Sequence, residues 1–338
     1  MEKANRNQMK EINKNMIRKI LKERRKATKP ELAEITQLSV VTVNALISEM
    51  IISGEAIEGD DVPSNGGRPS KQYIYNGNYK LAAIIYGLEK EKRNFFSMLL
   101  INLFGECIER RTSCIEYATT ESFESWIDEA VNQYQNISAI LFGLPGVEEN
   151  GVITSNDFPG LIGDKFITFY KNKYKIPVLF ENDVNATVWG YYQHINSNDI
   201  KNVVGLYYPR SYGPGAGIVI QGNVYKGNSN FAGEFAFISV KPSWDEVDFD
   251  NTDEVILMLS QILVIYSCVL APERFVLYGD FLTEQIIKNV IEKVTDVLQG
   301  KFTPFIEYKN SIDMDYELGL IHIAINQLEK SEDIKKWS

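Results

Sequence analysis

Two short helical segments joined by a tight turn stand near the start of the sequence. Residues 29–44 read KPELAEITQLSVVTVN, and residues 64–70 read SNGGRPS. Pro30 suits the first turn of a helix because the N–H that proline lacks has no helical partner there, and Ser39 suits the N-cap of the next helix. This pattern is typical of a helix-turn-helix followed by a β-hairpin wing. It predicts a winged DNA-binding domain over residues 1–76.

The spacing of apolar residues predicts three helices in this domain. A first helix is expected over residues 8–26, a second from Pro30 to about residue 38, and a third from the Ser39 cap to Ile52. The apolar positions expected to face the core are Met9, Ile12, Met16, Ile17, Ile20, Leu21, Leu32, Ala33, Ile35, Val43, Leu46, Ile47 and Met50. Residues 55–58 and 71–75 are expected to form the two wing strands.

The third helix is expected to enter the major groove of DNA with its N-terminal end first. The residues predicted to contact DNA are Ser39, Val40, Val41, Thr42, Asn44 and Ser48, with Arg68 of the wing. Valine methyls suit thymine, an asparagine amide suits adenine, and Thr42 suits a phosphate. Arg68 would reach a narrow minor groove from its glycine-rich turn. The alternative for residues 66–69 is a flexible turn between domains.

Charge is divided unequally along the chain. The whole chain carries 35 basic and 45 acidic residues, a net charge of −10, whereas residues 1–30 carry eleven Lys and Arg against three Glu, a net charge of +8. The remainder therefore carries −18, because −10 minus +8 is −18. An acidic surface repels the phosphate backbone, so the sequence places DNA binding in the N-terminal segment alone.

The remaining composition indicates a cytoplasmic protein without a membrane partner. No apolar run approaches the roughly 18 residues that cross a bilayer, and the first residues lack a signal-peptide core. Cys107, Cys114 and Cys268 are scattered and odd in number, which indicates reduced thiols. A length of 338 residues predicts two or three domains.

Beyond residue 76 the sequence alternates between buried strands and helices. Continuous apolar runs of the kind found in parallel sheets occur at residues 138–142, 178–180, 203–206 and 274–277. Residues 82–86 and 95–101 are predicted to be strands joined by a turn. The body is therefore predicted to have an α/β fold.

Three motifs in the body resemble those of the ROK family, whose name stands for repressors, open reading frames and sugar kinases. They are GLPGV at residues 143–147, ENDVNA at residues 181–186, and a glycine-rich GPGAGIVIQG at residues 213–222 that is followed by FAGE at residues 231–234. Together with the winged helix, they resemble regulators of the xylose-repressor and N-acetylglucosamine-repressor type. The resemblance covers nearly the whole chain.

The resemblance implies an α/β fold class in which a winged helix-turn-helix precedes a two-lobed, actin-like (ribonuclease H-like) sugar-kinase body. The first lobe is expected over residues 77–185, completed by a C-terminal helix at about residues 312–338, and the second lobe over residues 186–311. The sugar-binding residues implied at the hinge are Asn182, Asp183, Glu234, Gly143 and Asn156. Asp183 takes the position of the kinases' catalytic base, here vestigial. The alternative for Asn182 and Asp183 is a cap where a strand meets a helix.

The sequence departs from the family's kinases where phosphate would bind. Residues 86–91 lack the paired glycines, the Asp and the Thr of the family's first phosphate turn. In the second phosphate loop, Tyr212 adds bulk and Pro214 removes a backbone donor. Asp280 would put a negative charge near a negative ligand. These changes predict that the chain is not an active kinase and uses no cofactor.

Zinc-binding members of the family carry a His shortly after the AGE motif and a Cys-rich loop beyond it. Here Phe237 takes the His position, residues 241–250 contain neither Cys nor His, and the whole chain has two His. Tetrahedral zinc needs about four such ligands, so no metal is expected. Tyr212, Phe237 and Trp244 would either line a more aromatic pocket or belong to the core.

The sequence therefore predicts a DNA-binding transcriptional regulator, a repressor, of sugar-metabolism genes. Its expected partners are a double-stranded, pseudo-palindromic DNA operator, further copies of the chain in a dimer or tetramer, and a carbohydrate effector that it binds without phosphorylating. Two alternatives stay open. One is a ligand-blind DNA-binding protein whose body only oligomerises, and the other is a residual sugar kinase.

Overall fold

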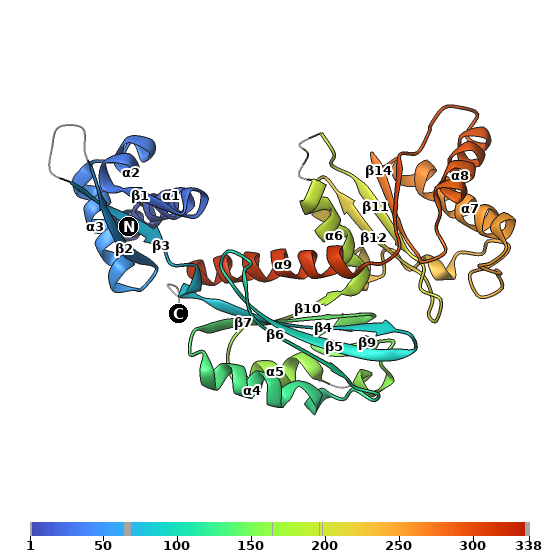
Figure 1. Cartoon of the computed structure of the whole chain (residues 1–338), viewed down its shortest axis with the longest axis horizontal. Coiled ribbons are helices and arrows are strands. Elements are labelled where there is room, and N and C mark those ends of the chain that lie inside the picture. The colour runs from blue at the N-terminus through green and yellow to red at the C-terminus, as the bar shows by residue number, and fades with distance from the viewer. Residues whose placement is uncertain (1, 64–68, 164, 196, 198, 335–338) are drawn as a thin grey trace. The chain divides into compact units, whose positions relative to one another are not determined.

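The computed structural model describes residues 2–63, 69–163, 165–195, 197 and 199–334. By their internal contacts they fall into two units, Met1–Leu81 with Asn102–Glu106, and Ala82–Ile101 with Cys107–Ser338. Each unit has a hydrophobic core of its own. Figure 1 shows the helices and strands of the chain.

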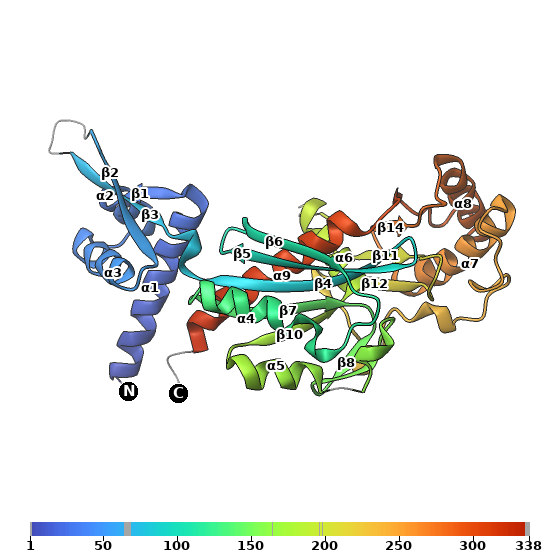
Figure 2. The ribbon, with the colours of Figure 1, turned by 60° about the horizontal axis from the view of Figure 1, so that its bottom comes forward.

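The first unit is a winged helix, in which three helices pack with a three-stranded antiparallel sheet of order β1-β3-β2 (Figure 2). Its elements are α1 (Glu2–Arg24), β1 (Lys26–Thr28), α2 (Lys29–Thr36), α3 (Val40–Ile52), β2 (Ala56–Val62) and β3 (Ser70–Tyr75). Thr28 and Glu31 form a capping box at the start of α2, and the Ser39 hydroxyl caps α3. These local caps explain why α2 and α3 lie within two residues of the bounds that the sequence predicts.

Fewer residues of α1 are buried in the core of the first unit than the sequence predicts. Its fully buried helical residues include Ile17, Leu21, Leu32, Val43, Ile47 and Met50. Met9, Ile12 and Met16 were expected to face this core, but they are exposed. At 3.6 residues per turn these three share a stripe on a different side of α1 from Ile17 and Leu21. Ile35 of α2, also expected to point inward, is exposed as well, and Thr36 is buried beside Leu32 instead.

In the second unit, the first lobe is built on a five-stranded sheet of order β10-β7-β4-β5-β6. Its strands are β4 (Leu81–Lys90), β5 (Arg93–Asn102), β6 (Cys107–Cys114), β7 (Ile137–Leu144) and β10 (Val178–Asn182), and β8 (Val147–Glu149) pairs with β9 (Val152–Ser155) in a separate hairpin. β7 and β10 are parallel, as their apolar runs predict. Helices α4 (Glu124–Gln133) and α5 (Phe166–Tyr174) cover one face of the sheet, and α9 (Asp313–Ile334) lies against the other (Figure 1).

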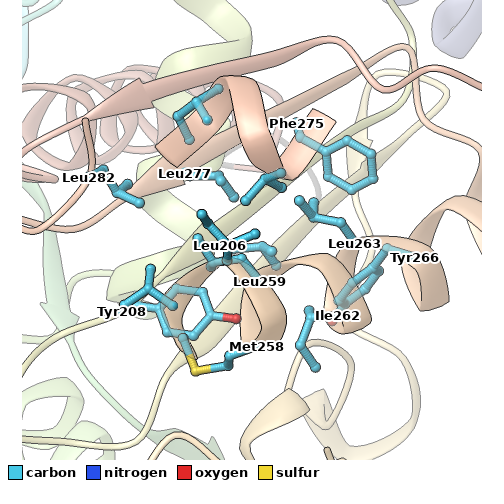
Figure 3. Packing of buried hydrophobic residues seen from close by; sticks show 14 of the residues in the cluster. Leu206, Tyr208, Met258, Leu259, Ile262, Leu263, Tyr266, Phe275, Leu277 and Leu282 are labelled. Atoms are coloured by element: carbon cyan, nitrogen blue, oxygen red, sulfur yellow. The ribbon is translucent and has the colours of Figure 1, made fainter. Parts of the chain in front are cut away.

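The second lobe is a five-stranded sheet of order β13-β12-β11-β14-β15 with helices on both faces. Its elements are α6 (Asp183–Ile195), β11 (Val203–Tyr207), β12 (Gly215–Ile220), β13 (Asn223–Val224), α7 (Thr252–Leu270), β14 (Arg274–Tyr278), α8 (Glu284–Val297) and β15 (Ile306–Lys309). Leu206 and Leu277 of the sheet pack in one core with Leu259 of α7 (Figure 3). Successive strand residues face opposite sides, so Gly205 faces Val188 of α6 instead.

Helix α7 is long and apolar enough, by length and composition alone, to cross a bilayer. This result corrects the expectation that no apolar run approaches that length. Helices α2 and α3 pass the same test only as a pair bent by 117°. Half of the apolar window of α7 is buried inside the fold, and Val255, Leu259 and Leu263 are fully buried. A core helix passes this test as readily as a span does, so α7 is weak evidence for a membrane.

Candidate functional site

The exposed side of α3 carries most of the residues predicted to contact DNA. Val40 is 55% exposed and Val41 is 80% exposed, and Asn44 lies on the same side one turn further along. Ser39 and Thr42 lie at the start of the helix, where the Ser39 hydroxyl accepts from the Thr42 N–H at 3.1 Å and bonds the Thr42 hydroxyl at 2.8 Å. These two hydroxyls therefore already serve the helix cap.

The other two residues predicted to contact DNA are Ser48 and Arg68. Ser48 is half-buried near the C-terminal end of α3. Arg68 lies outside the described residues. The structure thus brings Val40, Val41 and Asn44 together on one open surface.

Lys29 is a neighbour of Asn44 that the sequence analysis missed. Its ammonium donates to Asn44 Oδ1 and lies 4.9 Å from the centre of the Tyr73 ring. No local spacing rule links residues 29 and 44, because they belong to different helices. The contact exists only because α2 and α3 pack across the turn.

Several basic residues of the N-terminal segment are paired inside the first unit. Lys14 and Arg18 both bond the buried Glu55, and Lys10 pairs with Glu49 of α3. Arg25 lies over the Phe104 ring, 3.5 Å from its centre, and 3.6 Å from Glu106. The formal charge of this segment therefore overstates the cations that are available to phosphates.

A cavity of about 560 Å³ opens in the second unit between the end of β4, the start of α6 and the loop after β11. Six carboxylates and three cations line it. Arg210 is bonded to Asp280 at 2.8 Å, and Lys90 is bonded to Asp313. Because two of the three cations are already paired with acids of the cavity, its surface is unfavourable for a polyphosphate.

Two carboxyl groups of this cavity, those of Asp183 and Asp157, have raised pKa values, as does Glu234 of a smaller cavity beside it. Burial, followed by the charge of Asp157, raises the pKa of Asp183 to about 7. Burial, followed by the charge of Glu89, raises the pKa of Asp157 to about 6. Burial also raises the pKa of Glu234. A carboxyl group that is buried without a neighbouring cation has a raised pKa, because its charged form is poorly solvated inside the protein.

A smaller cavity of about 60 Å³ lies beside the first one, between β10, α6 and the segment after β13. Asn182 and Glu234, both predicted sugar ligands, line it together with Asn185. The Oδ1 atom of Asn185 is buried and has no hydrogen-bond partner among the described residues. Lys226 spans the wall of this cavity, with its ammonium 2.8 Å from Glu181 Oε2. Asn185 belongs to the ENDVNA motif, but the sequence does not show that its side-chain oxygen is buried without a hydrogen-bond donor. That observation comes from the structure.

Two residues predicted to bind sugar have other contacts in the structure. Asn156 donates to the Pro145 carbonyl at 2.7 Å and accepts from the Phe158 N–H at 2.7 Å, so its amide holds the loop after β7. Gly143 lines neither cavity, because it faces α9, where an added Cβ would lie 2.6 Å from Leu320.

Asn182 and Asp183 also take the positions of the alternative strand-to-helix cap. Asn182 Oδ1 accepts from the Asn185 N–H at 3.0 Å, and its Nδ2 donates to the Gly146 carbonyl at 3.2 Å. Asp183 is the buried first residue of α6 and lines the larger cavity. Asn182 and Asp183 can therefore serve both as the cap between strand and helix and as ligand-binding residues. Asn182 lines the smaller cavity and Asp183 lines the larger one.

The three aromatic residues singled out in the sequence have three different environments. Tyr212 lines the larger cavity, and its pKa is raised by burial and by a hydrogen bond to Glu89. Trp244 packs against the core of the second lobe. Phe237 is 77% exposed and stacks on Phe231 with ring centres 5.9 Å apart. Within the described part of the chain, no group of three or more His, Cys, Asp or Glu side chains is placed to hold a metal ion.

Residues 96–254 match the model of the ROK family. The matched segment contains the three motifs that resemble this family, so the predicted resemblance is confirmed. A putative xylose repressor of Caldicellulosiruptor sp. (strain Rt8B.4) is 28% identical over 243 residues, which cover 69% of this chain and 59% of the relative. The xylose repressor of Bacillus subtilis (strain 168) is 23% identical over 256 residues, which cover 71% of this chain and 63% of the relative. The chain thus spans about three fifths of the length of these relatives.

Solved structures share the fold around the ROK domain. A ROK family transcriptional regulator described as a homologue of the E. coli MLC protein superposes with a TM-score of 0.66 at 15% identity, over 97% of this chain and 99% of that one. A putative N-acetylmannosamine kinase from Listeria monocytogenes superposes with a TM-score of 0.57 at 15% identity, over 74% of this chain and 99% of that one. These likenesses confirm the predicted fold class, a mixed α/β chain with a ROK body of the actin-like type. At such identities they speak to the fold alone.

Proposed function

We propose that this chain is a sugar-responsive transcriptional regulator that represses sugar-metabolism genes from a DNA operator. The names of its relatives support this assignment, because they are called xylose repressors. The winged helix supports it independently, because α3 exposes Val40, Val41 and Asn44 while its other side fills the core. Such a helix fits the major groove. A cytoplasmic dimer or tetramer would place two of these helices on a pseudo-palindromic operator.

The effector is a carbohydrate that binds between the two lobes of the body. The observation that carries this proposal is the unpartnered, buried Oδ1 of Asn185 in the smaller cavity, beside Asn182 and Glu234. A sugar hydroxyl would satisfy this acceptor, and burial without a donor costs on the order of 1–3 kcal/mol. Hydroxyl groups also suit the amide and the carboxyl groups beside it, since these groups donate and accept.

The size of the smaller cavity suggests how sugar binding reaches the DNA-binding unit. A space of about 60 Å³ holds only a few water molecules. A monosaccharide therefore fits only if the two lobes take another relative position that enlarges this cavity. Sugar binding would then favour that arrangement of the lobes. A ligand changes DNA affinity only through such a difference between two states.

Phosphoryl transfer is not part of the proposed function. A kinase needs donors and cations around the phosphates of its nucleotide. In the larger cavity Arg210 is bonded to Asp280, and Tyr212 is hydrogen-bonded to Glu89. Asp157 and Asp183 add acids without adding cations. This electrostatic balance favours a body that binds sugar and leaves it unchanged.

The proposed function is tested by fluorescence anisotropy of the full chain on the DNA upstream of its own gene. The titration is repeated at fixed salt with xylose, glucose and N-acetylglucosamine, and with their 6- or 5-phosphates. One of these compounds should shift DNA affinity, and Asn185→Ala should remove the shift while leaving DNA binding intact. Asn223→Ala, an exposed amide of β13, is the matched control and should respond as the wild type does.

Two outcomes would contradict the proposal in different ways. Tight DNA binding that no sugar changes, with no thermal stabilisation by any sugar, would favour a body that only oligomerises. A ligand at a hundred times its dissociation constant should add about 2.7 kcal/mol, so its absence is readily measured. Sugar-dependent turnover of ATP that Asp183→Asn abolishes would favour a residual kinase.

A further inference from the structure

The contact between Lys29 and Asn44 fixes which atoms of Asn44 face outward. Lys29 is the first residue of α2, and its ammonium donates to the side-chain oxygen of Asn44. The orientation of the amide is unambiguous, because an ammonium group has three donors and no acceptor. Asn44 therefore keeps its Nδ2 group, with two donors, for any partner on the open side of α3.

The Lys29 side chain is itself held in place. Its ammonium lies 4.9 Å from the centre of the Tyr73 ring, and Tyr73 is buried in the sheet of the first unit. A cation over an aromatic face is attracted by the ring. This contact keeps the ammonium beside Asn44. Its positive charge there repels a second hydrogen-bond donor that approaches the remaining lone pair of Oδ1.

The major groove presents a different pattern for each base. Guanine offers two acceptors, N7 and O6, whereas adenine offers the N7 acceptor and the N6 donor. An asparagine reads adenine by donating to N7 and accepting from N6. Lys29 occupies one lone pair of Asn44 Oδ1 and places its positive charge beside the other, so Asn44 is a poor acceptor for N6. The structure therefore does not favour the adenine contact that the sequence suggested.

We propose that Lys29 and Asn44 act as one donor-only reading group that selects guanine in the operator. Nδ2 of Asn44 and the remaining N–H groups of Lys29 would donate to guanine O6 and N7. Val40 and Val41 lie four and three residues before Asn44 on the same side of α3, where they suit thymine methyls. The inference rests on the proposed DNA-binding function and names the base that this function reads.

The test uses the full chain and a library of duplexes with a randomised 20-base-pair centre. Wild type and four variants each select from the library, and the selected sequences are then bound singly with each base at the position of interest. Asn44→Ala identifies that position by losing its preference. Lys29→Met keeps the length of the stem over Tyr73 but frees the oxygen of Asn44, so the preference should move from guanine toward adenine by about tenfold.

Two more variants check the chemistry of the pair. Lys29→Arg keeps a donor-only partner for Asn44 and should keep the guanine preference. Asn44→Asp replaces the donors with acceptors and should move the preference from guanine toward cytosine, whose N4 is a donor. This second variant keeps the test decisive if Lys29→Met melts early, and thermal melting of every variant verifies folding.

The outcomes separate this inference from the proposed function. Specific DNA binding with adenine at the position that depends on Asn44 would overturn the inference alone. So would a Lys29→Met variant that loses affinity equally for all four bases, since that result marks a phosphate contact. A wild type that selects no sequence would overturn the proposed function and the inference with it.

Discussion

At the scale of single residues, two buried carboxyl groups show how neighbouring charge decides protonation. Glu55 of the first unit is 1% exposed, and Asp183 of the body is 9% exposed. Burial favours the neutral form of each. Arg18 and Lys14 overcome it at Glu55 and lower its pKa, whereas Asp183 gains further acids as neighbours and its pKa rises to about 7. Their contributions to stability therefore depend on pH in opposite directions.

Glu55→Gln should destabilise the winged helix by about 3–5 kcal/mol at pH 7, because it removes the nearer of the two carboxylates that pair with the buried Arg18. The folded pKa of Glu55 is lowered, so its contribution is present above the unfolded pKa and is lost as pH falls through the folded value. Hydrogen exchange of amides in α1 and β3 measures the effect. Glu58→Gln, at an exposed position of β2, is the control and should change exchange little. Equal exchange in both variants would contradict this account.

Asp183→Asn should stabilise the body by about 1–3 kcal/mol at pH 8 and hardly at pH 4. Because the folded pKa of Asp183 is raised to about 7, its contribution is fully present below the unfolded value and is lost as pH rises through about 7. Urea unfolding at several pH values between 4 and 8 measures the difference. The exposed Asp199→Asn serves as the matched control. A difference between Asp183→Asn and wild type that does not grow with pH would refute the raised pKa.

At the scale of elements, the crossing of α6 and α9 connects the two lobes of the body. The helices meet at two glycines, and an added Cβ at either one would lie 1.8 Å from a backbone oxygen of the other helix. At Gly190 this oxygen belongs to Asp315, and at Gly319 it belongs to Ala186. No side chain can yield there, because the atoms in the way are backbone.

Gly319→Ala should destabilise the body by about 1–3 kcal/mol or more, because the helices must separate. The sign of the change in unfolding free energy is informative. By helix propensity alone, replacing glycine with alanine would stabilise the helix by about 1 kcal/mol. Urea unfolding monitored by near-ultraviolet circular dichroism measures the change. Met314→Ala, at a position of α9 that is 85% exposed, is the control. A stabilised Gly319→Ala variant would mean that the close crossing is absent.

At the scale of the whole molecule, the separate cores of the two units predict separate unfolding. Calorimetry of the full chain should resolve two transitions, one for each unit. A saturating sugar should raise only the transition of the body, by about 5–10 °C, because ligand stabilises the unit that binds it. DNA should raise the other transition. A sugar that raises both transitions equally would indicate that the units unfold as one.

Much of the fold follows from the sequence because it depends on local rules. The caps at Thr28 and Ser39 act over three residues, and the apolar runs of β7 and β10 mark parallel strands by themselves. The motifs single out Asn182 and Glu234 as expected sugar ligands, and both line the smaller cavity. Such features can be predicted because each cap, apolar run or motif consists of residues that are neighbours in the sequence.

Other features depended on packing between distant residues. Met9 and Ile17 are both apolar and lie on one helix, but only the packing of α1 on the sheet exposes the first and buries the second. The bond from Lys29 to Asn44 and the unpartnered oxygen of Asn185 likewise arise where separate elements meet. Spacing along the chain carries no information on these contacts. Local chemistry in the sequence therefore determined the elements and their caps, whereas the tertiary structure decided which polar atoms remain free to bind a ligand.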